Sequence, residues 1–237
     1  MTKPFVIWTV QRTGSTSLAN MLTLLSGEVV HHEPFNQDRF LSYQKEQNKL
    51  LESLEELKEK QLNFKHCWNV HPNWCNDLIL DFVLKENYSV ILLYRQNMLK
   101  VQLSKELAKQ TGIWGKKEKL QVNNAIALQP IDITILKTAI NTYQTQLNKY
   151  RERFKNSSYS DREVCFEKLF EERSSFTEKL QYLGKICQFL AIDTNSFAQN
   201  EDKLYQQLVD NKQNDTQDYE KIPNFQEIKQ EFENYAI

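Results

Sequence analysis

A short apolar run that ends in a polar, glycine-containing turn restricts the fold of this 237-residue chain more than any other feature. The run Phe5–Val10 is rich in β-branched and aromatic side chains, which predicts a buried strand. The turn Gln11–Ser17 follows it directly and contains Gly14 among four hydroxyl residues. Apolar residues then recur at helical spacing over Leu18–Leu25, and Gly27 suits the end of a helix. Strand, tight turn and helix in this order are typical of an α/β sheet protein.

Further strands and helices are expected to alternate along the chain, which predicts a parallel α/β sheet flanked by helices. The expected strands lie near 29–30, 63–68, 88–94 and 163–166, and the expected helices cover 38–60, 73–84, 97–110, 133–154 and 176–190. No internal repeat or Pro/Gly/Ser linker divides the sequence, so we expect a single domain over residues 1–237. Residues 200–237 are polar and acidic, which predicts a loosely packed C-terminal segment with a short helix near 225–235.

Composition and charge argue against several classes of protein. The 30 basic and 31 acidic side chains give a formal net charge of −1, whereas a general nucleic-acid binder is usually strongly basic. No apolar run approaches the roughly 18–20 residues that span a bilayer, and the N-terminal apolar stretch is too short for a signal peptide. The four cysteines (67, 75, 165 and 187) form neither a CxxC pair nor a disulfide framework. We therefore expect reduced thiols in a cytoplasmic protein with no transmembrane segment and no nucleic-acid partner.

The junction at Gly14 has the residue types of an anion-binding helix end. The first N–H groups of a helix lack partners within it, and the helix dipole adds roughly half a positive charge there. Gly14 lets the backbone approach a ligand closely, and Arg12 adds a planar, permanently charged group that suits phosphate or sulfate oxygens. The hydroxyl residues of this candidate loop are Thr13, Ser15, Thr16 and Ser17. An ordinary capped helix without a ligand is the structural alternative.

The first comparison for such a loop is a P-loop nucleotide-binding protein. In a Walker A register ending here, Thr9 takes the first glycine position and Ser15 takes the lysine position. A nucleoside-triphosphate enzyme without that lysine would lose its contact to the β- and γ-phosphates. A P-loop-like nucleotide kinase is therefore kept as an alternative to the main hypothesis.

The segment Val10–Leu18 resembles the 5′-phosphosulfate loop of sulfotransferases, in which a basic residue precedes Ser/Thr-Gly-Ser/Thr-Thr. This resemblance implies a P-loop-like, sulfotransferase-type fold. It also implies that the loop binds the phosphosulfate of PAPS (3′-phosphoadenosine 5′-phosphosulfate). Arg12 takes the basic position, as in the bacterial and carbohydrate-type branches of the family.

A second segment adds to this resemblance. Arg95 ends the most apolar of the expected strands, and Ser104 lies on the helix that follows. In sulfotransferases an arginine and a serine in these places hold the 3′-phosphate of the nucleotide; nine positions separate them here, against the usual eight. The tail Gln110–Trp114 resembles the branch that includes bacterial trehalose and nodulation-factor sulfotransferases. Seven basic side chains against two acidic ones between residues 95 and 119 also favour an anion site.

The resemblance further implies which residues carry out the transfer. Glu33, after the second expected strand, resembles the proposed base of bacterial and carbohydrate sulfotransferases. His31, His32 and His66 are alternative bases, because neutral imidazole can accept a proton near pH 7. Lys65 resembles the central lysine of the family, whose charge can neutralise the sulfuryl oxygens. The expected catalytic residues are Glu33, Lys65, His66 and Arg12, and no metal-binding motif accompanies them.

These features predict a PAPS-dependent sulfotransferase that moves a sulfuryl group to a hydroxyl acceptor, a small molecule or a glycan. A non-catalytic nucleotide- or partner-binding protein on the same fold is the alternative from another class.

Overall fold

A five-stranded, all-parallel sheet organises the part of the chain that the computed structural model describes, residues 3–114, 127–155, 161–210 and 216–235. The strand order is β2-β3-β1-β4-β5. The strands are β1 (Phe5–Thr9), β2 (Val30–His32), β3 (Asn63–Cys67), β4 (Ser89–Tyr94) and β5 (Asp161–Cys165). The predicted α/β class, with a parallel sheet flanked by helices, is thereby confirmed.

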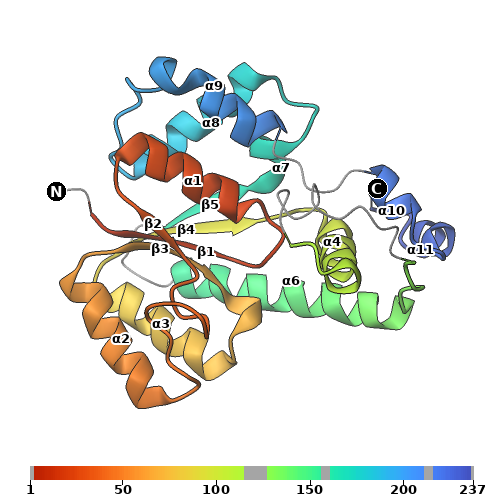
Figure 1. Cartoon of the computed structure of the whole chain (residues 1–237), viewed down its shortest axis with the longest axis horizontal. Helices are drawn as coiled ribbons and strands as arrows, with labels where there is room; N and C mark the ends of the chain where they lie inside the picture. Colours follow the sequence, from red (N-terminus) through yellow and green to blue (C-terminus); the bar gives the residue numbers. More distant parts are fainter. Residues whose placement is uncertain (1–2, 115–126, 156–160, 211–215, 236–237) are drawn as a thin grey trace.

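Helices cover both faces of the sheet (Figure 1). One face carries α1 (Ser15–Ser26), α7 (Phe166–Phe170), α8 (Phe176–Phe189) and α9 (Glu201–Tyr205). The other carries α2 (Gln47–Glu59), α3 (Asn73–Lys85) and α6 (Ile133–Lys155). A third group lies together at the right of Figure 1 and comprises α4 (Met98–Thr111), α10 (Thr216–Glu220) and α11 (Phe225–Glu231). The remaining elements are the short 3₁₀ helices η1 (Trp68–Val70) and η2 (Ala198–Asn200) and the π-helical turn η3 (Gln206–Asp210).

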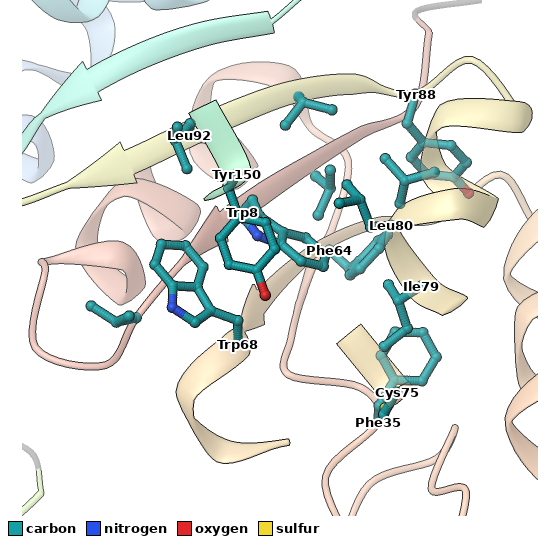
Figure 2. Packing of buried hydrophobic residues seen from close by; sticks show 14 of the residues in the cluster. Trp8, Phe35, Phe64, Trp68, Cys75, Ile79, Leu80, Tyr88, Leu92 and Tyr150 are labelled. Carbon is teal, nitrogen blue, oxygen red and sulfur yellow. The ribbon is translucent and has the colours of Figure 1, made fainter. Parts of the chain in front are cut away.

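Alternation along β1 divides the core into two layers. Val6 and Trp8 face the cluster shared with α2, α3 and α6, in which Trp8 meets Tyr150 edge-on with ring centroids 5.2 Å apart (Figure 2). Phe5 and Ile7 face the opposite cluster, with α1 and α8. Successive side chains of a strand point to opposite faces, so a strand buried on both faces needs an uninterrupted apolar run. Each fully buried large apolar side chain contributes about 1.5–3 kcal/mol.

The C-terminal residues form a third cluster with α4 and α6. Tyr219, Ile222, Phe225, Ile228 and Phe232 are all buried there, against Leu99 and Leu103 among others. The described part of residues 200–237 is therefore packed against the rest of the chain, which differs from the loosely packed segment that its polar composition predicts. Its few apolar side chains are divided between two clusters, since Leu204 and Leu208 pack in the cluster with α1 and α8.

The structure differs from the expected helices in two places. The helix expected over 38–60 begins only at Gln47, and residues 34–46 form an irregular loop. Gln44 and Lys45 have positive φ values of 50° and 63°, which interrupt helical geometry, while Leu41 and Tyr43 are buried beneath the loop. The short helix α7 directly after β5 was not expected.

The structure bears on two further expectations, that the cysteines are reduced and that the chain has no transmembrane segment. All four cysteines are buried and none forms a disulfide. Within the described ranges, no helix has both the length and the apolar character needed to cross a membrane.

The connections of β1 and β4 define where a ligand can enter. The chain leaves β1 through α1 toward β2, and leaves the adjacent β4 in the opposite direction through α4 and α6 toward β5. Ligands of open α/β sheets bind outside the carboxyl ends of the strands at such a switch point. The two sequence motifs that contain Arg12 and Arg95 both follow the strands at this point.

Candidate functional site

The β1–α1 turn is shaped by two residues in the left-handed backbone region. Arg12 has φ 70° and Gly14, the N-cap of α1, has φ 73°. A Cβ at Gly14 would lie 2.7 Å from the Phe170 ring, so glycine is required by both conformation and space. No side chain of the described ranges caps α1, which leaves this helix end able to bind an anion.

The hydroxyl residues of the turn have different surroundings. Thr13 is fully buried, and its Oγ1 donates to the carbonyl of Val10 at 2.8 Å and lies 2.6 Å from Oγ1 of Thr9. Its hydroxyl therefore holds the turn. Ser15 and Ser17 are buried, whereas Thr16 is exposed.

Arg12 joins the two motifs. Its Nε donates to Oγ of Ser104 at 2.8 Å, and one terminal nitrogen donates to the carbonyl of Trp114 at 3.0 Å. Arg95 in turn donates to the carbonyl of Arg12, at 3.4 Å. Arg12, Arg95 and Ser104, which sequence analysis assigned to two sides of one nucleotide, therefore meet at the carboxyl ends of β1 and β4.

Positive charge at this point exceeds negative charge. Among the described residues, no carboxylate lies within salt-bridge distance of Arg12. Burial lowers the pKa of Arg12; the Tyr219 phenol opposes that shift and the charge of Arg95 adds to it. The buried Nε of Arg95 has no hydrogen-bond partner in the part of the chain that the structure describes. In that part, these two partly buried guanidinium groups have a single carboxylate within salt-bridge distance, near Arg95, which favours the binding of an anion.

Glu167 supplies that carboxylate, and sequence analysis did not assign it a role. Its oxygens accept hydrogen bonds from the backbone N–H groups of Gln96 (3.0 Å) and Asn97 (3.1 Å). One of them also lies 4.0 Å from Nε of Arg95, whose guanidinium stacks 4.2 Å above the ring of Phe166. Glu167 thus fixes both the β4–α4 turn and Arg95.

Glu33 and Lys65 form a second charged pair beside the first turn of α1. Nζ of Lys65 lies 2.8 Å from Oε1 of Glu33 and donates to Oγ1 of Thr16 at 3.2 Å. Asn36 and the Cys67 thiol also donate to the carboxylate. Burial alone would raise the pKa of Glu33, but the charge of Lys65 and these hydrogen bonds outweigh it and lower the pKa to about 2.

His66 lies on the other face of β3. Its ring is fully buried 4.6 Å from the Trp8 ring, and Nε2 pairs with Oδ1 of Asn76 at 2.7 Å. Burial and the charge of His71 lower its pKa to about 3. The alternation of β3 separates His66 from Lys65 and Glu33, so the structure does not bring His66 together with the other expected catalytic residues.

The other two histidines that were considered as bases, His31 and His32, lie on β2 directly before Glu33. Burial lowers the pKa of His31, and burial together with the charge of Lys65 lowers that of His32 to about 4. Of the lysines in the basic segment, Lys100 and Lys105 are partly buried and Lys109 pairs with Glu106. Lys116, Lys117 and Lys119 lie outside the described residues.

No protein-family model matches this chain, and no curated protein matches it. Within the described ranges, no group of three or more His, Cys, Asp or Glu side chains is arranged to hold a metal ion.

Proposed function

We propose that the chain is a PAPS-dependent sulfotransferase. The observation that carries this proposal is the contact of Arg12 with Ser104, together with Arg95, at the switch point of the sheet. These residues come from two sequence motifs that resemble the 5′-phosphosulfate and 3′-phosphate sites of sulfotransferases. The four unbridged cysteines favour a cytoplasmic location.

The residues of the site fit a nucleotide that carries anionic groups at both its 5′ and its 3′ position. The uncapped end of α1 suits the 5′-phosphosulfate, with Lys65 and Thr16 beside it. Arg95 and Ser104 suit the 3′-phosphate, and Arg12 lies between the two sides. The unpartnered Nε of Arg95 gives a specific reason to expect an anion there.

In the proposed reaction the acceptor oxygen bonds to sulfur while the bond from sulfur to the phosphate oxygen breaks, and adenosine 3′,5′-bisphosphate leaves. The acceptor hydroxyl passes its proton to a base of the protein. Fixed cations can stabilise the charge on the transferring oxygens, and most of the rate gain comes from positioning and electrostatics. We propose that Lys65 and Arg12 supply these cations.

Glu33 is the proposed base, and its pair with Lys65 controls its basicity. A carboxylate with a pKa of about 2 is a weak base at neutral pH. If the Lys65 ammonium turns toward sulfuryl oxygens, Glu33 loses its main stabilising charge while it stays buried. Its pKa then rises toward the range in which proton transfer from a hydroxyl acceptor is more favourable.

The test is a titration with adenosine 3′,5′-bisphosphate, AMP and ATP, followed by thermal unfolding and calorimetry. Binding at about 100 times Kd adds about 2.7 kcal/mol of stability, which raises the Tm of a chain this long by about 5–10 °C. We expect that shift with the bisphosphate and a much smaller one with AMP. Equal binding of all three nucleotides, or none, would contradict the proposal.

A nucleotide kinase is favoured by one specific observation. Lys65 brings an ammonium group to the first turn of α1 from a neighbouring strand, where the loop itself lacks the Walker lysine. Preferential binding of ATP with Mg²⁺ would support this alternative. A sulfotransferase should instead transfer sulfate from PAPS to a hydroxyl acceptor, and we propose a sugar-containing molecule as the first acceptor to assay.

A further inference from the structure

A tight turn over residues 33–36 begins at the proposed base, Glu33. The backbone N–H of Asn36 donates to the carbonyl of Glu33 at 3.1 Å, and Pro34 takes the second position of the turn. Proline suits that position because its ring fixes φ near −65°. Glu33 itself has a φ of 49°, and its N–H donates to the carbonyl of Lys65 at 2.9 Å, which ties the turn to β3. Side chains held in this left-handed backbone region are uncommon and cluster at functional sites.

Phe35 anchors the same turn in the core. Its side chain is buried, and its ring meets the Phe64 ring edge-on, with centroids 5.7 Å apart. The His66 ring lies 6.2 Å away on the same strand as Phe64. A proline with a fixed φ followed by a buried phenylalanine leaves the turn little freedom. Asn36 is therefore held in one place beside Glu33.

The two oxygens of the Glu33 carboxylate have different partners. Oε1 lies 2.8 Å from Nζ of Lys65 and accepts from the Cys67 thiol at 3.5 Å. Oε2 accepts a hydrogen bond from Nδ2 of Asn36 at 2.9 Å. The lysine ammonium is carried on a flexible four-carbon stem, whereas the asparagine amide is short and belongs to the same rigid turn as the carboxylate. The Asn36 contact can therefore persist while Lys65 moves.

The contacts of Lys65 show which oxygen faces the proposed phosphosulfate. Nζ of Lys65 bridges Oε1 of Glu33 and Oγ1 of Thr16, and Thr16 lies in the first turn of α1. Oε1 is thus the carboxylate oxygen on the side of that helix end. When the ammonium turns toward sulfuryl oxygens, Oε1 loses its cation and can accept a proton, while Oε2 stays bound to Asn36. A general base must come within hydrogen-bond reach of the proton that it takes.

We propose that Asn36 is a positioning residue for the base: its amide holds Oε2 of Glu33 and thereby directs Oε1 toward the acceptor hydroxyl. The proton of that hydroxyl moves to Oε1 as the acceptor oxygen bonds to sulfur and the bond from sulfur to the phosphate oxygen breaks. The inference rests on the proposed function, because it assumes sulfuryl transfer at this end of α1. It adds which carboxylate oxygen takes the proton and which residue orients it.

The experiment measures sulfate transfer from PAPS to two acceptors, maltose and water, in the wild type and Asn36→Leu. Leucine is close to asparagine in size but cannot donate to Oε2, so kcat should fall about 10- to 100-fold with the KM for PAPS unchanged. Asn195→Leu is the matched control, since Nδ2 of Asn195 donates to Oδ2 of Asp193 at 3.0 Å on an exposed loop. Its kcat should equal that of the wild type.

The pH profile of kcat separates orientation of the base from an effect on its basicity. The Asn36 hydrogen bond lowers the pKa of Glu33, so its loss should move the acid limb of the profile to higher pH. A residue that only lowered basicity would leave the plateau above that limb unchanged or raise it, because the stronger base accepts a proton more readily. We expect the plateau of Asn36→Leu to stay about 10- to 100-fold low. An unchanged or higher plateau would overturn the inference while the proposed function stands.

Nucleotide binding distinguishes this failure from failure of the proposed function. Calorimetry should give the same affinity for adenosine 3′,5′-bisphosphate in the wild type, Asn36→Leu and Asn195→Leu, because Asn36 acts on the base. If Asn36→Leu loses binding as well as rate, its role is structural and the inference is wrong. The inference is also wrong if Glu33→Gln keeps the full rate, or if the wild type binds the bisphosphate but transfers sulfate to neither acceptor. If the wild type does not bind the bisphosphate, the proposed function itself fails.

Discussion

Arg12 and Ser104 lie 92 positions apart in the chain, yet Nε of the arginine donates a 2.8 Å hydrogen bond to Oγ of the serine. The bond is possible because β1 and β4 are adjacent and parallel, so the segments that follow them leave the same edge of the sheet. The fold brings the two residues together, since they are far apart in the sequence. Their meeting makes the β1–α1 turn and the α4 helix parts of one site.

Replacing Arg12 with lysine should weaken binding of adenosine 3′,5′-bisphosphate by about 10- to 100-fold, because charge-assisted hydrogen bonds contribute about 1.5–3 kcal/mol. Lysine keeps the charge but cannot contact Ser104 and the Trp114 carbonyl with two nitrogens of a rigid plane. Calorimetric titration measures the loss. Arg153→Lys, on an exposed ion pair with Asp81, is the control and should bind normally. Unchanged affinity in Arg12→Lys would show that Arg12 does not bind the nucleotide.

Gly14→Ala should destabilise the protein by about 2–5 kcal/mol. The positive φ of 73° costs about 1–2 kcal/mol for a residue with a Cβ, and the contact 2.7 Å from the Phe170 ring adds overpacking. Gly27→Ala is a matched control, because Gly27 has the same φ and nothing within 4 Å of its Cβ position. Urea unfolding should show a larger loss at Gly14 than at Gly27. Phe170→Leu in the Gly14→Ala background should recover part of the difference.

The fold was predictable where local pattern decides the structure. The apolar run of β1 and the turn at Gly14 indicate a strand, a turn and a helix through neighbouring residues alone. The start of α2 was not predictable in this way, because the buried side chains of Leu41 and Tyr43 hold residues 34–46 in an irregular path despite their helix-like composition.

The candidate site was predictable only in part, for a related reason. Arg95 directly follows an apolar strand and Arg12 lies in the turn after another, so both are recognisable from sequence. Glu167 reaches the same place from an element that is distant in sequence, and only tertiary packing shows it. His66 was misleading because it neighbours Lys65 in sequence, while strand alternation points it to the opposite face of the sheet.

Glu167→Gln should reduce the free energy of unfolding by about 3–5 kcal/mol, because it leaves the buried charge of Arg95 without its counter-ion. Glu163→Gln is the control, since Glu163 binds Arg151 with two 3.0 Å hydrogen bonds but is more exposed. Its loss should be within about 1 kcal/mol. Equal losses in urea unfolding would show that Glu167 is an ordinary surface carboxylate.

The ring of His66 should remain neutral from pH 7 down to about pH 4, because burial holds its pKa at about 3. His32, with a pKa of about 4, should titrate at higher pH. Histidine NMR signals measured against pH test this, and His66→Gln assigns the resonance. A midpoint near the ordinary value of about 6.5 for His66 would mean that its ring is accessible, and would restore it as a possible base.

The Glu33–Lys65 ion pair should make the free energy of unfolding depend on pH in the acidic range. The pKa of Glu33 is lowered from 4.5 to about 2, so the folded state favours the ionised carboxylate. Its contribution is complete above pH 4.5 and is lost as the pH falls through about 2. Urea unfolding between pH 7 and pH 3 should therefore show a steeper loss in the wild type than in Glu33→Gln. In Lys65→Met the carboxylate of Glu33 stays buried without its cation, so its pKa rises. The loss of stability that depends on Glu33 between pH 7 and pH 3 should then disappear. If that loss persists, the hydrogen bonds from Asn36 and Cys67 cause the lowered pKa of Glu33 instead.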